Sequence, residues 1–203
     1  GKWIQFDARS SDEHSLLRYR NLENADRELY NIDFLNVNEP FFLLEGAIDS
    51  TFIKNSIAFG GTQHLMKFLE QHPELKQNAH NGTVIWDNDD AGKDEIKKTV
   101  KMGFNWFEWT DIKANNKYKY NSDGTLRIIK DINNAVMYSD CFRLDKNGFI
   151  VFDDLKNYIR KADGAMIKLT LLYGNREKMK YEKQKQQAKK IISKTAKPTT
   201  PYF

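Results

Sequence analysis

Acidic side chains follow three apolar segments of this 203-residue chain, at or just beyond the end of each segment. The segments span residues 41–44, 83–86 and 128–129. The acids that follow them are Glu45, Asp87, Asp89 and Asp131. Carboxylates that lie close together repel one another unless a cation lies between them, and oxygen ligands without Cys or His favour Mg²⁺ or Mn²⁺. The pattern therefore predicts a Mg²⁺ (or Mn²⁺) site, which suits phosphoryl-transfer chemistry.

The elements that must position these acids are strands and helices in alternation. Short apolar runs at residues 41–44, 56–59, 83–86 and 106–109 are separated by segments with helical periodicity. This alternation is typical of βαβ units. It predicts the α/β class, with a mainly parallel four-stranded sheet flanked by helices. Ligands of open parallel sheets bind beyond the carboxyl ends of the strands, so acids distant in sequence are expected to converge there.

Several helices are expected between and after these strands. Leu65, Met66, Leu69 and Leu75 share one helical face after a cap at Thr62, and residues 91–102 form a helix that ends at Gly103. A helix is expected at residues 132–138. The other expected caps are Asp49 or Ser50 for a short helix through residue 53, and Asp153 or Asp154 for a helix through residue 159. With residues 165–173, this last helix makes a C-terminal helical extension.

A structural alternative exists for the acids, because Asp is a common helix cap after a strand. Asp89 or Asp90 could cap the helix at residue 91, Asp49 the helix at residue 51, and Asp131 the helix at residue 133. One such acid would carry little weight. Acids at three strand ends favour the metal site.

Composition limits the class of protein. The single cysteine, Cys141, excludes a disulfide framework and a zinc site built from several cysteines of this chain, and it favours a reducing compartment, the cytoplasm. No apolar run is long enough to cross a bilayer, so no membrane association is expected. The net charge is +4, from 32 basic and 28 acidic residues, and basic residues concentrate at 176–197, which could bind a phosphate backbone or remain solvated.

Two motifs resemble the signature of the Toprim family. Glu45-Gly46 follows one apolar strand, and Asp87-Asn88-Asp89-Asp90-Ala91-Gly92 follows another. Toprim domains show a Glu at the end of their first strand and an Asp-x-Asp-x-x-Gly element at the end of a later one. They occur in bacterial and phage primases, topoisomerases and certain nucleases.

Further segments resemble the primases of bacteria and phages within this family. They are Phe6-Asp7-Ala8-Arg9, Arg18-Tyr19-Arg20-Asn21, Leu29-Tyr30-Asn31 and Lys130-Asp131-Ile132-Asn133-Asn134. The resemblance covers roughly residues 3–159. It implies a nucleotidyltransferase that makes short RNA primers from ribonucleoside triphosphates on single-stranded DNA during replication, with a replicative helicase as a partner. If a phage encodes the chain, the compartment would be the host cytoplasm.

The resemblance also implies roles for individual residues. Asp87 and Asp89 would bind Mg²⁺, with Asp131 as a further ligand. Glu45 would be a ligand or the base that prepares the primer 3′-hydroxyl, and Gly92 would allow close packing. It implies nucleic-acid or nucleotide contacts for Arg9, Arg18, Arg20 and Lys130. The sequence pattern itself adds Lys117 and Lys119 as expected contacts. The last two flank Tyr118 and precede Tyr120 in a polar insertion, where these tyrosines could stack on bases.

The expected organisation has four parts. Residues 1–38 would end an upstream basic subdomain, 39–140 form the Toprim catalytic domain, 141–175 a helical subdomain and 176–203 a basic tail. We expect the chain to be part of a longer protein. Asn134 stands where many primases have another acid, which leaves the number of ions open.

Two other functions remain open. A Toprim nuclease would use the same acids to activate water, and a non-catalytic helicase-associated binding module would need none of them. A topoisomerase would need a tyrosine nucleophile on a separate domain, for which this chain has no room.

Overall fold

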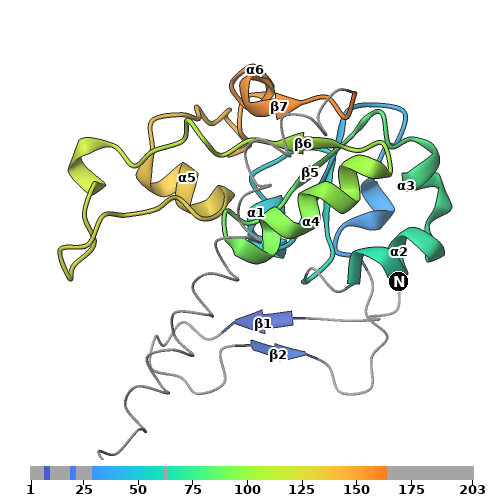
Figure 1. Cartoon of the computed structure of the whole chain (residues 1–203), viewed down its shortest axis with the longest axis horizontal. Helices are drawn as coiled ribbons and strands as arrows, with labels where there is room; N and C mark the ends of the chain where they lie inside the picture. The colour runs from blue at the N-terminus through green and yellow to red at the C-terminus, as the bar shows by residue number, and fades with distance from the viewer. Residues whose placement is uncertain (1–6, 10–18, 22–28, 62–63, 164–203) are drawn as a thin grey trace, which may run out of the picture.

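The chain forms a central five-stranded sheet with the strand order β4-β3-β5-β6-β7 (Figure 1). The computed structural model describes residues 7–9, 19–21, 29–61 and 64–163. The strands are β3 (Phe41–Leu44), β4 (Ser56–Ala58), β5 (Gly82–Ile85), β6 (Asn105–Phe107) and β7 (Ile159–Arg160). The first four are parallel, and β7 is antiparallel to β6. The α/β class is thereby confirmed, with a fifth strand that the sequence pattern did not predict.

The apolar runs form strands because both of their faces are covered. Phe41 and Leu43 of β3 belong to one apolar core, and the alternate residues Phe42 and Leu44 belong to the other. All four side chains are buried. A strand whose successive side chains enter two different cores reads as a continuous apolar run.

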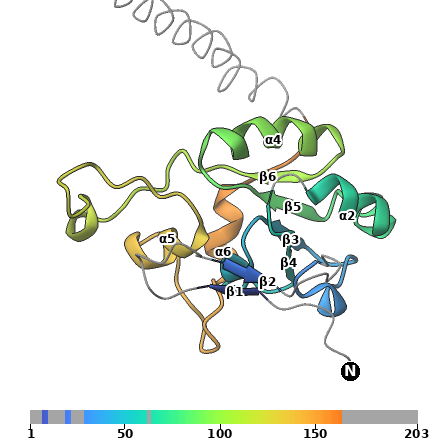
Figure 2. The same ribbon diagram turned by 90° about the horizontal axis from the view of Figure 1, so that it is seen from below.

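Helices cover both faces of the sheet. The helices are α1 (Ala47–Ser50), α2 (Leu65–Gln71), α3 (Pro73–Gln77), α4 (Asp90–Lys101), α5 (Ile132–Tyr138) and α6 (Phe152–Leu155). The 3₁₀ turns are η1 (Ile32–Phe34), η3 (Asn116–Tyr118) and η4 (Lys156–Tyr158). Helices α2, α3 and α4 contribute to the first core, and α5 and α6 to the second. Figure 2 shows α2 and α5 on opposite sides of β3, β4 and β5.

Several helix predictions are confirmed and others are wrong. Helix α5 has the expected bounds, and Gly103 ends α4 with a φ of 94°. Met66 is 49% exposed, because Phe68 occupies the buried face of α2. Thr62 lies outside the described residues.

Two cap predictions are also wrong. Asp49 and Ser50 lie inside α1, whose cap is Gly46. Asp153 and Asp154 lie in the first turn of α6, after Val151 at the cap position, and α6 ends at Leu155. The chain then passes through η4 into β7, so the extension is not helical throughout. Within residues 141–175, those after 163 lie outside the described part, as does the basic tail.

Strands β1 (Asp7–Arg9) and β2 (Tyr19–Asn21) form a separate antiparallel pair. In their register Arg9 lies opposite Tyr19, and Ala8 lies opposite Arg20. Arg18 lies outside the described residues. No helix of the described part is long and apolar enough to cross a membrane.

Candidate functional site

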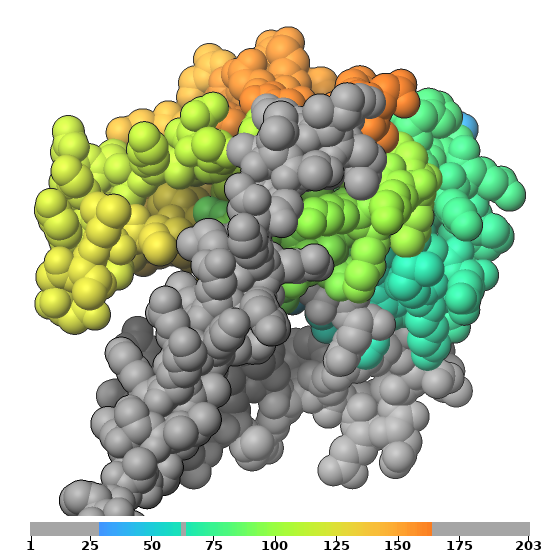
Figure 3. All heavy atoms as spheres, viewed as in Figure 1, coloured from blue at the N-terminus to red at the C-terminus, as the bar shows by residue number. Residues whose placement is uncertain are grey.

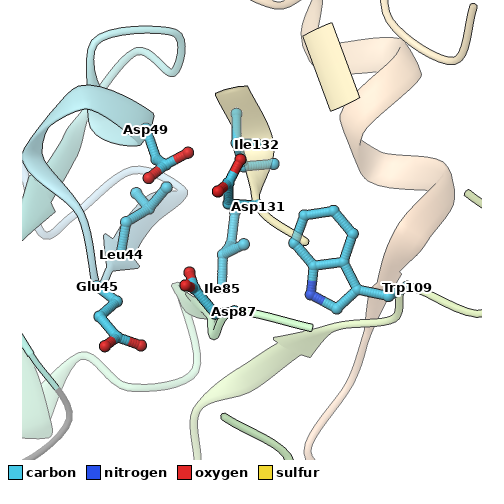
Figure 4. A pocket seen from close by; sticks show the side chains of 8 residues that line it. All are labelled: Leu44, Glu45, Asp49, Ile85, Asp87, Trp109, Asp131 and Ile132. Atoms are coloured by element: carbon cyan, nitrogen blue, oxygen red, sulfur yellow. The ribbon is translucent and has the colours of Figure 1, made fainter. Parts of the chain in front are cut away.

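The ends of two adjacent parallel strands bring the first acids together. Strands β3 and β5 pair in a register that sets Leu44 beside Ile85. Glu45 follows β3 and Asp87 follows β5 by two residues, so both carboxylates extend from the same edge of the sheet (Figure 4). A small pocket opens there. It is lined by Leu44, Glu45, Asp49, Ile85, Asp87, Trp109, Asp131 and Ile132.

Asn88 holds Asp131 near this edge. Its backbone N–H donates to the carbonyl oxygen of Lys130 at 2.6 Å, and its side-chain amide donates to the carbonyl oxygen of Ile129 at 2.9 Å. These two hydrogen bonds join the loop after β5 to the residues before α5, about forty positions later in the sequence. Sequence reasoning missed this role, because the motif pattern specifies the aspartates on either side of Asn88 and not Asn88 itself.

Lys130 lies between two of the acids. Its Nζ is 3.4 Å from Oδ2 of Asp87 and 3.4 Å from Oδ2 of Asp89. Burial lowers the pKa of Lys130, but the charges of Asp87 and Asp89 outweigh burial and raise it overall. A cation thus already bridges the two motif aspartates within the chain.

Three of the acids also cap helices, which confirms part of the structural alternative. Oδ1 of Asp89 accepts from the N–H of Gly92 at 3.0 Å, at the start of α4. Oδ1 of Asp131 accepts from the N–H of Asn134 at 2.7 Å, at the start of α5. Oδ1 of Asp49 accepts from the N–H of Asn133 at 2.8 Å, so Asp49 caps α5 and not its own helix.

Capping does not exclude a second role for these side chains. Each of the three caps engages one oxygen, Oδ1, and a carboxylate has a second oxygen that can accept from a donor or a cation. In Asp89 that second oxygen already faces the ammonium of Lys130. The caps fix the carboxylates in place and use one oxygen of each.

Burial and mutual repulsion raise the pKa values of three carboxyl groups in the site. Burial, with the charges of Asp87 and Asp89, raises the pKa of Glu45 to about 7. Burial also raises the pKa of Asp49 to about 6, with added repulsion from Asp131 and Asp87 that exceeds the effect of the Asn133 hydrogen bond. The pKa of Asp87 is raised as well, chiefly by burial and in spite of Lys130.

Asp89 differs from these neighbours. Burial acts to raise its pKa, but the N–H of Gly92 and the ammonium of Lys130 lower it overall. The Lys130 ammonium therefore offsets burial at Asp89, whereas at Glu45 and Asp87 it only reduces the rise in pKa. The repulsion between carboxylates that raise one another's pKa is relieved when a cation binds among them.

The donor set fits a hard cation in its chemistry. The pocket acids and Asp89 offer oxygen only, which Mg²⁺ and Mn²⁺ prefer. Among the residues that the structure describes, no three Asp, Glu, His or Cys side chains surround one point as a preformed ligand shell. The Lys130 ammonium lies between Asp87 and Asp89, two of the carboxylates that would hold such an ion.

The glycines of both motifs lie in close contact with the acids, and at Gly92 the contact is with backbone. A Cβ at Gly92 would collide with the carbonyl oxygen of Asp87 and would lie 3.1 Å from Cβ of Trp86. A Cβ at Gly46 would collide with Oδ2 of Asp49. The role of Gly92 in close packing, which the resemblance implied, is therefore confirmed by geometry.

The expected basic contacts are not all gathered here. Lys130 lies at the acids, whereas Lys117 and Lys119 lie in and after η3, outside the pocket lining. For Arg9 and Arg20 the structure describes only the strands that carry them. Sequence reasoning also missed Asp49 as a pocket residue and Trp109, whose Nε1 donates to the carbonyl oxygen of Trp86 at 2.8 Å.

Comparison with known proteins adds no relative to this description. Neither a protein-family model nor a curated protein matches the chain. The assignment of a function therefore rests on the acidic pocket and on the motifs that build it.

Proposed function

We propose that this chain is the Toprim-type catalytic core of a primase, which joins ribonucleotides on a single-stranded DNA template. One observation carries the proposal. Glu45, Asp87 and Asp89 follow two adjacent parallel strands, and a cationic group, the Lys130 ammonium, lies between the two aspartates. The five-stranded, mostly parallel sheet flanked by helices is consistent with a Toprim-like arrangement.

The cation would be held by oxygen ligands of this chain. Asp87 and Asp89 are the first candidates, and Asp131 offers its second oxygen from the neighbouring helix start. When bound, Mg²⁺ or Mn²⁺ supplies Lewis-acid stabilisation of the charge that develops on the transferred phosphoryl group. Glu45 either joins these ligands or accepts the proton; in the metal-free chain its pKa is raised to about 7, chiefly by burial.

The proposed reaction is nucleotidyl transfer. The 3′-hydroxyl oxygen of the growing primer forms a bond to the α-phosphorus of the next ribonucleoside triphosphate, and the bond to pyrophosphate breaks. The hydroxyl proton goes to a base, for which Glu45 is the candidate. Lys130 is half-exposed beside the acids, so its ammonium can turn to the triphosphate as that ligand arrives. Arg9, Arg18 and Arg20 are proposed contacts for the template or the incoming nucleotide, because Arg binds phosphate oxygens in pairs.

The test uses the longest available form of the protein with single-stranded DNA, ribonucleoside triphosphates and Mg²⁺, and separates the products on a sequencing gel. We expect short RNA oligomers from the wild type. Glu45→Gln and Asp89→Asn should reduce them by at least about a hundredfold, the lower end of the range for loss of a positioned acid–base group. Asparagine is chosen at residue 89 because it preserves the cap of α4.

Matched controls separate the site from general charge effects. Glu39→Gln changes an exposed acid before β3, whereas Glu45 follows the same strand. Asp90→Asn changes the exposed acid beside Asp89. Both controls should keep RNA synthesis. A shortened template without new RNA would point to a nuclease instead, and an unchanged template without RNA would point to a binding module; either outcome contradicts the primase proposal.

A further inference from the structure

Residues 113–130, which we name the arm, leave the core beside the acidic pocket and return to it. The preceding residue, Ile112, is buried in the second core, and the following residue, Asp131, lines the pocket. Figures 1 and 2 show the arm, in yellow-green to yellow, reaching away from the sheet in both views. The space-filling view shows it standing out from the edge of the molecule (Figure 3).

The base of the arm is fixed to α5. The Arg127 guanidinium lies 4.0 Å from the ring centroid of Tyr138, and its Nε donates to the carbonyl oxygen of Tyr118 at 3.0 Å. The rings of Tyr118 and Tyr138 pack edge to face at 5.6 Å. The N–H of Asn115 donates to the carbonyl oxygen of Tyr138 at 2.8 Å. These contacts commit the ring of Tyr118 to packing and hold the arm in a set position beside the pocket.

The tip of the arm is a small hairpin with exposed apolar side chains. Tyr120 and Leu126 form an antiparallel bridge, so their side chains lie on the same face. Tyr120 is 58% exposed, Leu126 is 60% exposed, and Ile128 on the returning segment is 68% exposed. The turn itself is ordered by Asp123, which accepts from the N–H and the hydroxyl of Thr125.

Basic residues are interleaved with these apolar ones. The arm carries Lys113, Lys117, Lys119, Arg127 and Lys130 against the single acid Asp123. Lys119 Nζ lies 5.6 Å from the ring centroid of Tyr120. Cationic groups beside an open aromatic face are the usual means by which proteins hold single-stranded nucleic acid, because the rings stack on bases while the charges meet phosphates.

We propose that the arm is a platform for the single-stranded nucleic acid that enters or leaves the acidic pocket, with Tyr120 stacking on a base. The choice of ligand rests on the proposed function. The positive charge matches a polyanion, and the returning segment leads from Leu126 to Lys130 at the acids. A single strand fits better than a duplex, because its bases present free faces to Tyr120 and the apolar side chains beside it.

The first measurement is metal-free binding, so that the pocket cation contributes nothing. The 203-residue chain is titrated in EDTA against a fluorescein-labelled oligothymidylate of about 15 nucleotides, and anisotropy gives Kd. Tyr120→Leu removes the ring and keeps apolar area; we expect Kd to rise by about fivefold or more, as for loss of one stacked base. Tyr120→Phe should restore wild-type affinity.

The second measurement is the salt dependence of the same binding. The Lys117→Gln/Lys119→Gln variant should weaken binding and make the dependence on salt shallower. The slope of log K against log salt is negative, and its magnitude should fall by about 1.4, at about 0.7 for each phosphate contact to a single strand. Lys67→Gln/Lys76→Gln, in α2 and α3, is the matched charge control. Phe34→Ala in η1, whose side chain is 82% exposed, is the matched aromatic control.

The outcomes are distinct from those of the RNA-synthesis test. If Tyr120→Leu and the double lysine variant bind the oligonucleotide as the wild type does, the platform is wrong. A duplex bound as tightly as the single strand, with the same loss in the variants, would also overturn it. Weakened binding in these variants supports the platform even if no RNA is made, so the failure of one proposal does not hide that of the other.

Discussion

At the residue scale, Gly92 shows how the acidic site constrains a helix. Alanine is a better helix former than glycine by about 1 kcal/mol, so Gly92→Ala would ordinarily stabilise α4. Here the added Cβ would collide with the carbonyl oxygen of Asp87. We expect a net loss of about 1–3 kcal/mol in the free energy of unfolding, the usual cost of an overpacked site. Urea denaturation measures it, with Lys97→Ala in the same helix as the control. A stability equal to or above the wild type would show that the Asp87 loop can move aside.

At the element scale, the caps of α5 separate the structural role of an acid from its charge. Asp131→Ala removes the acceptor for the N–H of Asn134 and should lower the free energy of unfolding by about 0.5–2 kcal/mol. Asp131→Asn keeps an acceptor and should unfold close to the wild type. Both variants should bind Mn²⁺ more weakly, as titration calorimetry would measure. If the asparagine variant binds Mn²⁺ with wild-type affinity, Asp131 is a cap alone.

Also at this scale, the sequence predicted strands better than it predicted their surroundings. Phe41–Leu44 could be predicted as a strand because a short continuous run of four apolar residues is typical of a strand with both faces buried. Strand β7 could not be predicted from the sequence, because it has only two residues and its partner, β6, lies some fifty positions earlier. The sequence predicts Asp49 as a cap of its own helix, whereas in the structure its carboxylate accepts a hydrogen bond from the N–H of Asn133. Contacts between distant segments leave no periodic signal.

The same limit applies to the candidate site. The acids at the strand ends could be predicted because parallel strands end at one edge of a sheet, and β3 and β5 do so. The position of Lys130 between Asp87 and Asp89 depends on the hydrogen bonds of Asn88, which no spacing rule predicts. Sequence reasoning therefore located the acids and missed what holds them together.

At the scale of the whole molecule, the raised carboxyl pKa values make stability depend on pH. Between the unfolded and folded pKa values, the folded chain keeps protons on Glu45 and Asp49 that the unfolded chain has released. The pKa of Glu45 is raised from 4.5 to about 7, and that of Asp49 from 3.8 to about 6. The free energy of unfolding should therefore fall as pH rises from about 4 to about 7. Asp89 and Asp154, whose pKa values are lowered, act in the opposite sense and only below about pH 4.

A cation should reverse this loss, because it stabilises the ionised carboxylates in the folded state alone. We expect Mg²⁺ in the millimolar range to raise the melting temperature more at pH 8 than at pH 5, as measured by thermal denaturation followed by circular dichroism. Glu45→Gln/Asp49→Asn should flatten the pH dependence without Mg²⁺ and reduce the gain with it. Glu39→Gln/Asp90→Asn changes two exposed acids outside the pocket lining and should leave both effects as in the wild type. If Mg²⁺ raises the melting temperature equally at both pH values, its binding does not involve the carboxylates that face the pocket.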